Sequence, residues 1–344
     1  MNDTTTVLSE ALAWSKEGRR VALATVVSTW GSSPRPVASH LAVDEEGRFV
    51  GSVSGGCVEG AVIQTAGEVI ENGEPRLLKF GVADETAWQV GLACGGTIEV
   101  FVERLADAES LSTLVNDASG SDVAALVTLV PEGQHCRLLA SGAENGDLIL
   151  DSQEHAGVAN AVESSRSGFV DGPSRRLFVE VWEPPLRLIV VGAVHITQYL
   201  APLAVQLGYE VTVIDPRSAF ASAERLPEVT LIDVWPDDAI ATLRPDRRTA
   251  VVVLTHDPKF DDPALIAALQ TPAFYIAALG SRRTHAKRLD RLTSAGCDAA
   301  ALDRINGPAG LDIGARTPPE IALSVVAEMT AQLRRPATSI EGSK

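Results

Sequence analysis

The sequence predicts an α/β protein: an N-terminal α+β domain followed by a C-terminal Rossmann-like domain built on a doubly wound parallel sheet. The 344 residues are enough for about two domains. Residues from 186 onward alternate short apolar strands with helices, which is typical of a parallel sheet with right-handed crossovers. In the earlier residues, apolar and polar side chains alternate as in β-strands, and glycine-rich loops separate these segments. Tandem prolines at 184 and 185 interrupt both patterns, so we place the domains at 1–183 and 186–344.

The first domain begins with an apolar pattern that predicts a helix over residues 6–17 and a strand over 21–27. Residues 41–53 predict two strands joined by a turn at 44–47. Apolar residues at helical spacing follow the glycines at 55 and 56 and stop at residues 72–73. Further strands are predicted at 97–102, 123–130, 148–150 and 177–181. We detect no internal repeat.

The second domain has a more regular pattern. A buried strand at 188–192 leads into a helix at 196–207, which Gly208 ends. Four more strands are predicted at 210–214, 230–233, 249–254 and 273–277, with helical segments between them. This alternation predicts the doubly wound sheet, in which ligands bind beyond the carboxyl ends of the strands.

Composition excludes several classes of protein. The 45 acidic and 29 basic side chains give a net charge of −16, which repels phosphate backbones, so we expect no nucleic-acid partner. No apolar run approaches the roughly 20 residues that span a bilayer, and the N-terminus lacks a signal-peptide pattern. Four widely spaced cysteines without a C-x-x-C pair indicate free thiols. We therefore expect a cytoplasmic protein without a membrane partner.

The turn after the first strand of the second domain is a candidate ligand site. Gly192, Val194 and Thr197 occupy the glycine positions of the G-x-G-x-x-G dinucleotide fingerprint, and Asp215 follows the next strand. Val194 places a branched side chain where backbone normally approaches the pyrophosphate. The turn therefore predicts binding of NAD(P), binding of another phosphate-bearing ligand at the helix N-terminus, or no ligand. His195 is a base, an electrophile, or a capping or packing residue.

A second candidate is the loop before the predicted helix of the first domain. Ser54, Gly55 and Gly56 let the backbone turn sharply and approach a ligand. Cys57 falls at the predicted helix start, where the helix dipole stabilises a thiolate. This placement suits a nucleophile, a metal ligand or a sulfur carrier, although a small buried residue would give the same pattern. Glu59 belongs to the same motif, which covers residues 51–60.

Two further first-domain segments carry candidate residues. Cys94, Gly95 and Gly96 form a second cysteine–glycine neighbourhood, which would either face the first one in the fold or serve packing. The segment after the first strand holds Ser32, Ser33 and Arg35, whose hydroxyl and guanidinium groups suit a phosphate or an anionic ring. A plain turn is the alternative for this segment.

Polar residues also follow the later strands of the second domain. His256 follows the fourth strand. Four candidates follow the fifth, where arginines against an acidic background indicate an anion site or a solvated helix start: Gly280, Ser281, Arg282 and Arg283. Arg316 precedes the last helix.

Taken together, the chain resembles the XdhC/CoxI family, accessory proteins that mature molybdenum hydroxylases such as xanthine dehydrogenase. The matching segments cover both halves in the expected order: residues 29–35, 51–60, 94–96, 192–195, 279–283 and 307–317. The resemblance implies a chaperone that binds molybdenum cofactor, as molybdopterin or its dinucleotide form, and supports its sulfuration with a cysteine desulfurase. It further implies insertion into an apo molybdenum hydroxylase, and a homodimer. Val194 departs from the G-x-G-H that the family tends to have.

The resemblance implies a carrier rather than a catalyst, with no catalytic residue. Arg35 and the first glycine loop would contact the pterin, with Cys57, together with Cys94, near the molybdenum or the transferred sulfur. Gly192, Asp215 and the later arginines would hold the phosphate or nucleotide. Two alternatives are an NAD(P)-dependent oxidoreductase, with His195 or His256 near the nicotinamide, and a scaffold that bridges desulfurase and hydroxylase without binding cofactor.

Overall fold

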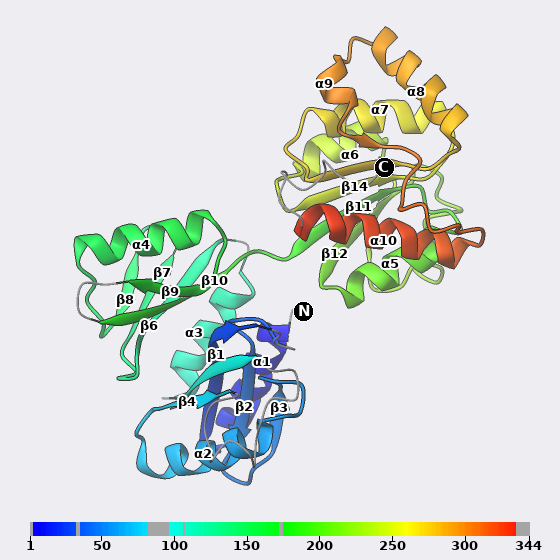
Figure 1. Ribbon diagram of the computed structural model, residues 1–344. Helices are drawn as coiled ribbons and strands as arrows, with labels where there is room; N and C mark the ends of the chain where they lie inside the picture. Colours follow the sequence, from blue (N-terminus) through cyan, green and yellow to red (C-terminus); the bar gives the residue numbers. More distant parts are fainter. Residues whose placement is uncertain are drawn as a thin grey trace. The chain divides into compact units, whose positions relative to one another are not determined.

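A computed structural model describes residues 3–31, 35–81, 96–105, 107–120, 122–139, 141–171 and 175–334. The chain divides into two compact units, Met1–Pro184 and Pro185–Lys344, at the tandem prolines (Figure 1). The first unit is α+β and the second is a Rossmann-like parallel sheet, which confirms the predicted fold class. Among the described helices, none combines the length and apolarity needed to cross a bilayer.

The first unit contains two antiparallel sheets of five strands each. The first sheet has the order β3-β2-β1-β5-β4. Its strands are β1 (Val21–Trp30), β2 (His40–Asp44), β3 (Phe49–Gly51), β4 (Arg76–Phe80) and β5 (Thr97–Arg104). Because side chains alternate along a strand, Ala22 and Ala24 of β1 pack with α2 (Glu59–Asn72), whereas Val21 and Leu23 pack with α1 (Asp3–Lys16).

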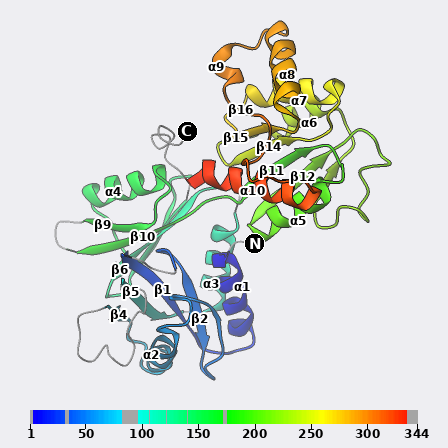
Figure 2. The same cartoon turned by 45° about the vertical axis from the view of Figure 1, so that its right-hand side comes forward.

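The second sheet has the order β8-β7-β6-β10-β9. Its strands are β6 (Ala124–Val130), β7 (His135–Leu139), β8 (Glu144–Gly146), β9 (Gly168–Asp171) and β10 (Arg176–Trp182). Helix α3 (Ala108–Ala118) precedes β6, and α4 (Ser152–Glu163) follows β8. Figure 2 shows α3 beside α1, and both helices contribute to one apolar cluster.

The two sheets are copies of one arrangement, so our expectation of no internal repeat is wrong. Repeat 1 (residues 3–104) and repeat 2 (residues 108–182) each run helix, three strands, helix, two strands, with the same strand order. The strand registers coincide as well. Equivalent opposed pairs are Thr25–His40 with Thr128–His135, and Leu23–Glu103 with Leu126–Glu180.

The repeat also leaves a trace in the sequence. From the histidine that opens β2 or β7 to a glutamate near the start of the next helix, the spacing is 19 residues in both copies. The matched residues are His40, Gly47, Gly51 and Glu59 in repeat 1, and His135, Gly142, Gly146 and Glu154 in repeat 2. Other positions differ, and connections of unequal length interrupt the match, which is why apolar periodicity alone does not reveal it.

Equivalent residues of the two repeats meet where the sheets face each other. Val27 and Phe101 of the first sheet form a buried cluster with their counterparts, Val130 and Phe178, of the second. Glu99 and Arg176, which are also equivalent, form an ion pair at 3.0 Å. The first unit therefore has a local two-fold relation at its centre.

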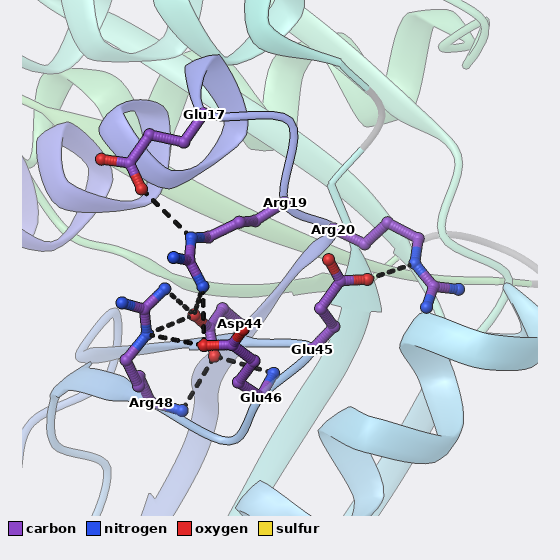
Figure 3. A network of polar contacts seen from close by, with 7 residues as sticks. All are labelled: Glu17, Arg19, Arg20, Asp44, Glu45, Glu46 and Arg48. Atoms are coloured by element: carbon purple, nitrogen blue, oxygen red, sulfur yellow. Dashed lines mark hydrogen bonds and ion pairs between the residues drawn. The ribbon is translucent and has the colours of Figure 1, made fainter.

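The β2–β3 hairpin is closed by a buried carboxylate at the end of β2. Asp44 accepts hydrogen bonds from the Arg48 side chain (2.7 Å) and from the Arg19 side chain (3.4 Å), as Figure 3 shows. Its other oxygen accepts from the backbone N–H groups of Arg48 (2.8 Å) and Glu46 (3.0 Å). Because Asp44 is 1% exposed, these donors replace the water that its charge loses on folding.

The second unit is a six-stranded parallel sheet with the order β13-β12-β11-β14-β15-β16. The strands are β11 (Leu186–Val191), β12 (Tyr209–Ile214), β13 (Thr230–Ile232), β14 (Thr249–Val253), β15 (Tyr275–Ala278) and β16 (Ile305–Asn306). Its strand order reverses direction between β11 and β14, and ligands of such sheets bind beyond the carboxyl ends at that point.

Helices cover both faces of this parallel sheet (Figure 1). On one face lie α5 (Thr197–Gln206) and α10 (Pro318–Arg334), whose apolar residues join one core cluster. On the other lie α6 (Pro236–Leu243), α7 (Pro258–Leu269) and α8 (Arg282–Ser294), followed by the short α9 (Ala299–Leu302). This two-sided cover explains the continuous apolar runs of β11 and β14.

The predicted strand at residues 148–150 is wrong. Leu148 and Leu150 are buried and Ile149 is 84% exposed, so the alternation is real, but the segment is a loop laid over the core of repeat 2. The apolar pattern also does not predict five short strands of two to five residues: β4, β7, β8, β9 and β16.

We expect Asp44→Asn to lower the free energy of unfolding by about 1.5–3 kcal/mol, because the variant weakens hydrogen bonds to a buried charge. Urea unfolding at neutral pH measures this difference. Glu46→Gln, at a side chain that is 63% exposed, is the matched control and should cost less than about 0.5 kcal/mol. Equal losses in the two variants would contradict the role given to Asp44.

Candidate functional site

The candidate motifs of the first unit lie at one end of the first sheet. Trp30, the last residue of β1, pairs with Thr97, the first residue of β5. Leu41, near the start of β2, pairs with Gly51, the last residue of β3. The connections that follow β1, β3 and β4 therefore all leave or enter the sheet at this end. Of the predicted residues on them, Ser32, Ser33, Cys94 and Gly95 lie outside the described part of the chain.

Comparison of the two repeats shows which of these connections the fold itself requires. Residues 31–39 join β1 to β2, whereas residues 131–134 suffice in repeat 2. Residues 81–96 join β4 to β5, whereas residues 172–175 suffice between β9 and β10. Because repeat 2 builds the same sheet without the extra length, this strand order does not require the two longer connections of repeat 1.

The loop between β3 and α2 is wound around the carboxylate of Glu59, which is 9% exposed. One oxygen accepts hydrogen bonds from the Ser52 hydroxyl (2.7 Å) and from the backbone N–H groups of Ser54 (2.9 Å) and Val53 (3.3 Å). The other accepts from the Ser54 hydroxyl (2.5 Å) and from the N–H groups of Gly56 (2.8 Å) and Val58 (3.2 Å). Burial by itself raises the pKa of Glu59, but the hydrogen bonds from Ser54 and Ser52 lower it to about 2.

These contacts change the roles expected for two predicted residues. Ser54 is 1% exposed and its hydroxyl also accepts the N–H groups of Cys57 and Val58, both at 3.0 Å. Ser54 and Glu59 therefore hold the loop together and do not face a ligand. The loop has the ring of N–H donors of an anion-binding nest, but its own glutamate fills that nest.

The outer rim of the loop consists of Gly55, Gly56 and Cys57, all exposed. The φ angles of Gly55 and Gly56 are 77° and 116°, and a Cβ added to Gly56 would meet no atom within 4 Å. Cys57 lies just before Val58, the N-cap of α2, and not in the first helical turn as expected. The rim presents a thiol beside bare backbone.

Arg35 joins a second predicted motif to this loop. Its Nε donates to the backbone oxygen of Ser52 at 3.2 Å. The segment after β1 and the loop after β3 therefore meet, as their common place at the sheet end requires. Gly96, the described end of the third motif, directly precedes Thr97 of β5.

The turn after β11 has the shape of a dinucleotide turn with different contacts. Gly192 has a φ angle of 111°, and a Cβ there would lie 2.8 Å from the side chain of Thr255, so only glycine fits. Thr197 is fully buried and donates to the Gly192 carbonyl oxygen at 2.5 Å. His195 is exposed, with its ring 5.4 Å from that of Tyr199.

Asp215 braces this turn from the end of β12. It is fully buried and accepts the Ala193 N–H (2.9 Å) and two hydrogen bonds from the Arg217 guanidinium (2.8 and 2.7 Å). Burial raises the pKa of Asp215, but Arg217 outweighs it, so the net shift is downward. The carboxylate is committed within the chain, and any contact to a ligand would pass through Arg217. The Arg217 guanidinium lies 4.3 Å from the centre of the Phe220 ring. Arg217 is not among the site residues predicted from the sequence.

The loops after β14 and β15 are tied together by buried charges that the sequence analysis also missed. Thr255 donates to Asp261 at 2.5 Å, and Arg288 lies 3.4 Å from the same carboxylate. Arg288 also donates to the carbonyl oxygen of Leu279, directly before Gly280. The Asp261 and Arg288 side chains, each 2% exposed, thus connect these two loops at the carboxyl edge of the sheet. In the sequence, the signal for this buried pair is Arg288, which lies six residues after Arg282 on the inner face of α8.

The remaining predicted residues lie around this edge. Ser281 caps α8 by accepting the Thr284 N–H at 3.1 Å. Arg282 is 3.6 Å from Asp312, and both side chains are almost fully exposed. His256, Arg283 and Arg316 are exposed. Within the described ranges, no three His, Cys, Asp or Glu side chains are grouped to hold a metal ion.

Comparisons with known proteins agree with this architecture. Residues 14–81 match the model of the XdhC and CoxI family, and residues 188–329 match that of the XdhC Rossmann domain. The molybdenum cofactor insertion chaperone PaoD of Escherichia coli (strain K12) is 30% identical over 331 residues, covering 96% of this chain and 89% of PaoD. The chain belongs to the XdhC and CoxI family. The predicted resemblance is confirmed.

Two further relatives support the XdhC and CoxI assignment over the whole length. A Bacillus subtilis (strain 168) protein, described as a probable component of xanthine dehydrogenase, is 29% identical, covering 91% of this chain and 93% of that protein. A crystal structure of a Bacillus halodurans protein, described as a xanthine dehydrogenase, has a TM-score of 0.79 at 25% identity and covers 98% of each chain.

We expect Glu59→Gln to destabilise the protein by about 2–3 kcal/mol at neutral pH, because the loop donors lose a charged acceptor. The pKa of Glu59 is lower in the folded protein than in the unfolded chain, so its contribution is complete above about pH 5. It disappears as the pH falls from about 4.5 toward about 2. Denaturant unfolding of both proteins between pH 7 and 3 measures this convergence.

Glu68→Gln is the control for this prediction, because Glu68 is an exposed residue of the same helix. It should leave the free energy of unfolding within about 0.5 kcal/mol of wild type. A Glu59→Gln deficit that stays constant down to pH 3 would contradict the role of the ionised carboxylate.

Proposed function

We propose that this protein is an accessory chaperone that binds molybdenum cofactor, supports its sulfuration and inserts it into a xanthine dehydrogenase-type hydroxylase. The observation that carries the proposal is the exposed thiol of Cys57 on a glycine rim. The equivalent segment of repeat 2, residues 147–153, which includes the first two residues of α4, has neither glycine nor cysteine. Relationship to a molybdenum cofactor insertion chaperone over 96% of this chain supports the same role.

The chemistry of the rim fits one end of such a cofactor. Molybdenum with dithiolene sulfurs is thiophilic, so the Cys57 thiol suits the metal or a sulfur atom in transfer. Gly55 and Gly56 let a planar ring approach the backbone without side-chain obstruction. The cofactor itself supplies the metal and sulfur chemistry that its target enzyme uses. The protein needs only to hold and release it.

In the first unit, the backbone of the Cys57 loop is not available to bind a phosphate group. The N–H groups of Gly55, Gly56 and Cys57 already donate to Ser52, Glu59 and Ser54, so they do not serve a phosphate. In the second unit, Arg282 and Arg283, exposed beside the carboxyl edge of the parallel sheet, suit a phosphate group, together with Arg217. Binding of molybdopterin or its dinucleotide form, with a cysteine desulfurase and an apo-hydroxylase as partners, completes the proposal. We also propose a homodimer in the cytoplasm.

The alternative of an NAD(P)-dependent oxidoreductase has weaker support. The Asp215 carboxylate would have to accept the ribose hydroxyls, but Arg217 and Ala193 already occupy it. Val194 adds a branched side chain at the turn. Quenching of tryptophan fluorescence by NADH, compared with quenching by molybdenum cofactor, separates the two functions.

We expect Cys57→Ala to copurify with at least about tenfold less molybdenum and pterin than wild type from a molybdate-fed host, since a thiolate–metal contact is lost. Metal analysis and pterin fluorescence after oxidation measure the content. Activation of an apo-hydroxylase by the purified protein should fall in parallel.

Cys297→Ala is the matched control, because Cys297 is a half-buried thiol of the second unit. It should keep wild-type cofactor content and activation. A Cys57→Ala protein that retained cofactor and still activated its target would overturn the thiol role. Absence of cofactor from wild type, with the partners captured, would favour the bridging scaffold instead.

A further inference from the structure

In the first unit, a histidine of each repeat contacts a glutamate of the other repeat. His40 of repeat 1 lies 2.7 Å, through Nε2, from the carboxylate of Glu180 in repeat 2, and its Nδ1 lies 3.1 Å from the Thr25 hydroxyl. The two-fold counterpart is the same set with the same distances: His135 to Glu103 at 2.7 Å and to Thr128 at 3.1 Å.

The backbone of His40 also anchors the start of the Cys57 loop. Its carbonyl oxygen accepts the Ser52 N–H at 2.9 Å. Gly51 lies directly against that carbonyl, where an added Cβ would come within 2.3 Å of the oxygen. A shift of His40 would therefore move the first residues of the loop, including the Ser52 carbonyl that Arg35 contacts.

Repeat 2 has a similar arrangement under its own loop, with the backbone hydrogen bond one residue further along the chain. The His135 carbonyl oxygen accepts the Leu148 N–H at 2.9 Å, and Gly146 lies as close to it as Gly51 lies to His40. The loop above, residues 147–153, carries none of the site motifs. The chain thus contains its own control for the function of the histidine–glutamate pair.

The two pairs differ in how well they are enclosed. The side chains of His40 and Glu180 are 2% and 5% exposed, and the Trp182 indole N–H donates to Glu180 at 2.7 Å. His135 is 30% exposed and lines a cleft of about 590 Å³ beside α3. A buried hydrogen bond has no water to replace its partner, so we expect the pair under the Cys57 loop to be the more rigid one.

We propose that Glu180 and His40 are positioning residues for the Cys57 loop. Repeat 2, which lacks the site motifs, supplies the carboxylate that fixes the histidine beneath the site of repeat 1. The importance of the loop rests on the proposed function, but its positioning does not. The test below therefore needs no cofactor, and its failure is distinguishable from failure of the proposed function.

Amide hydrogen exchange of the intact protein tests the proposal in crossed form. Glu180→Gln should raise exchange of the amides of residues 52–58 by about tenfold and leave residues 147–153 within about twofold of wild type. Glu103→Gln should do the reverse. The alkylation rate of Cys57 with iodoacetamide, read by peptide mass spectrometry, should change in Glu180→Gln and not in Glu103→Gln.

A merely structural role would loosen both loops alike in either variant, and that result would overturn the proposal. So would unchanged exchange at residues 52–58 in a folded Glu180→Gln protein. If Glu180→Gln does not fold, Trp182→Phe removes a single hydrogen bond to the same carboxylate. It should raise exchange at residues 52–58 by a smaller factor of about threefold, again without effect on residues 147–153.

Discussion

Buried carboxylates, each satisfied by donors of the loop or turn around it, are the constraint on which both candidate sites depend. Leaving such a charge unpaired costs several kcal/mol, so the surrounding backbone can take only shapes that deliver the donors. Glu59 gathers the loop that exposes Cys57. Asp215 gathers the Gly192 turn and the Arg217 guanidinium. In both places the acidic residue shapes the site from inside instead of facing a ligand.

The internal repeat separates architecture from function within the first unit. Both copies keep a histidine, a left-handed glycine and a glutamate at matched spacing, because these residues form the hairpin and anchor the following loop. Glu154 accepts from Arg175 in repeat 2, whereas Glu59 is held by backbone and serine donors in repeat 1. Only repeat 1 carries the long connections and the Cys57 rim. The sheet architecture is thus common to both repeats, whereas the candidate site motifs belong to repeat 1.

The second unit has the strand order of a dinucleotide-binding fold, but its contacts at the carboxyl ends of the strands differ. Its strand order and Gly192 turn are those of the fold, yet Thr197 stands at the third glycine position, and Arg217 takes the hydrogen bonds of Asp215 that ribose hydroxyls would use. The buried Asp261–Arg288 pair ties the next two loops together. These contacts favour an anion held by exposed arginines at the edge over an orthodox NAD(P) site.

Five of the six strands of the second unit could be predicted from the order of its residues, because each of them is a local apolar run. The end of α5 could be predicted from Gly208, whereas the two-residue strand β16 gives no such signal. The Cys57 motif could be located in the same way, since glycine and cysteine chemistry is local. Three features emerge only in the folded chain: Glu59 and Asp215 turn inward, Arg288 is buried, and His40 meets Glu180. Those contacts join residues up to 140 positions apart, and their energy exists only once the burial that requires them has occurred.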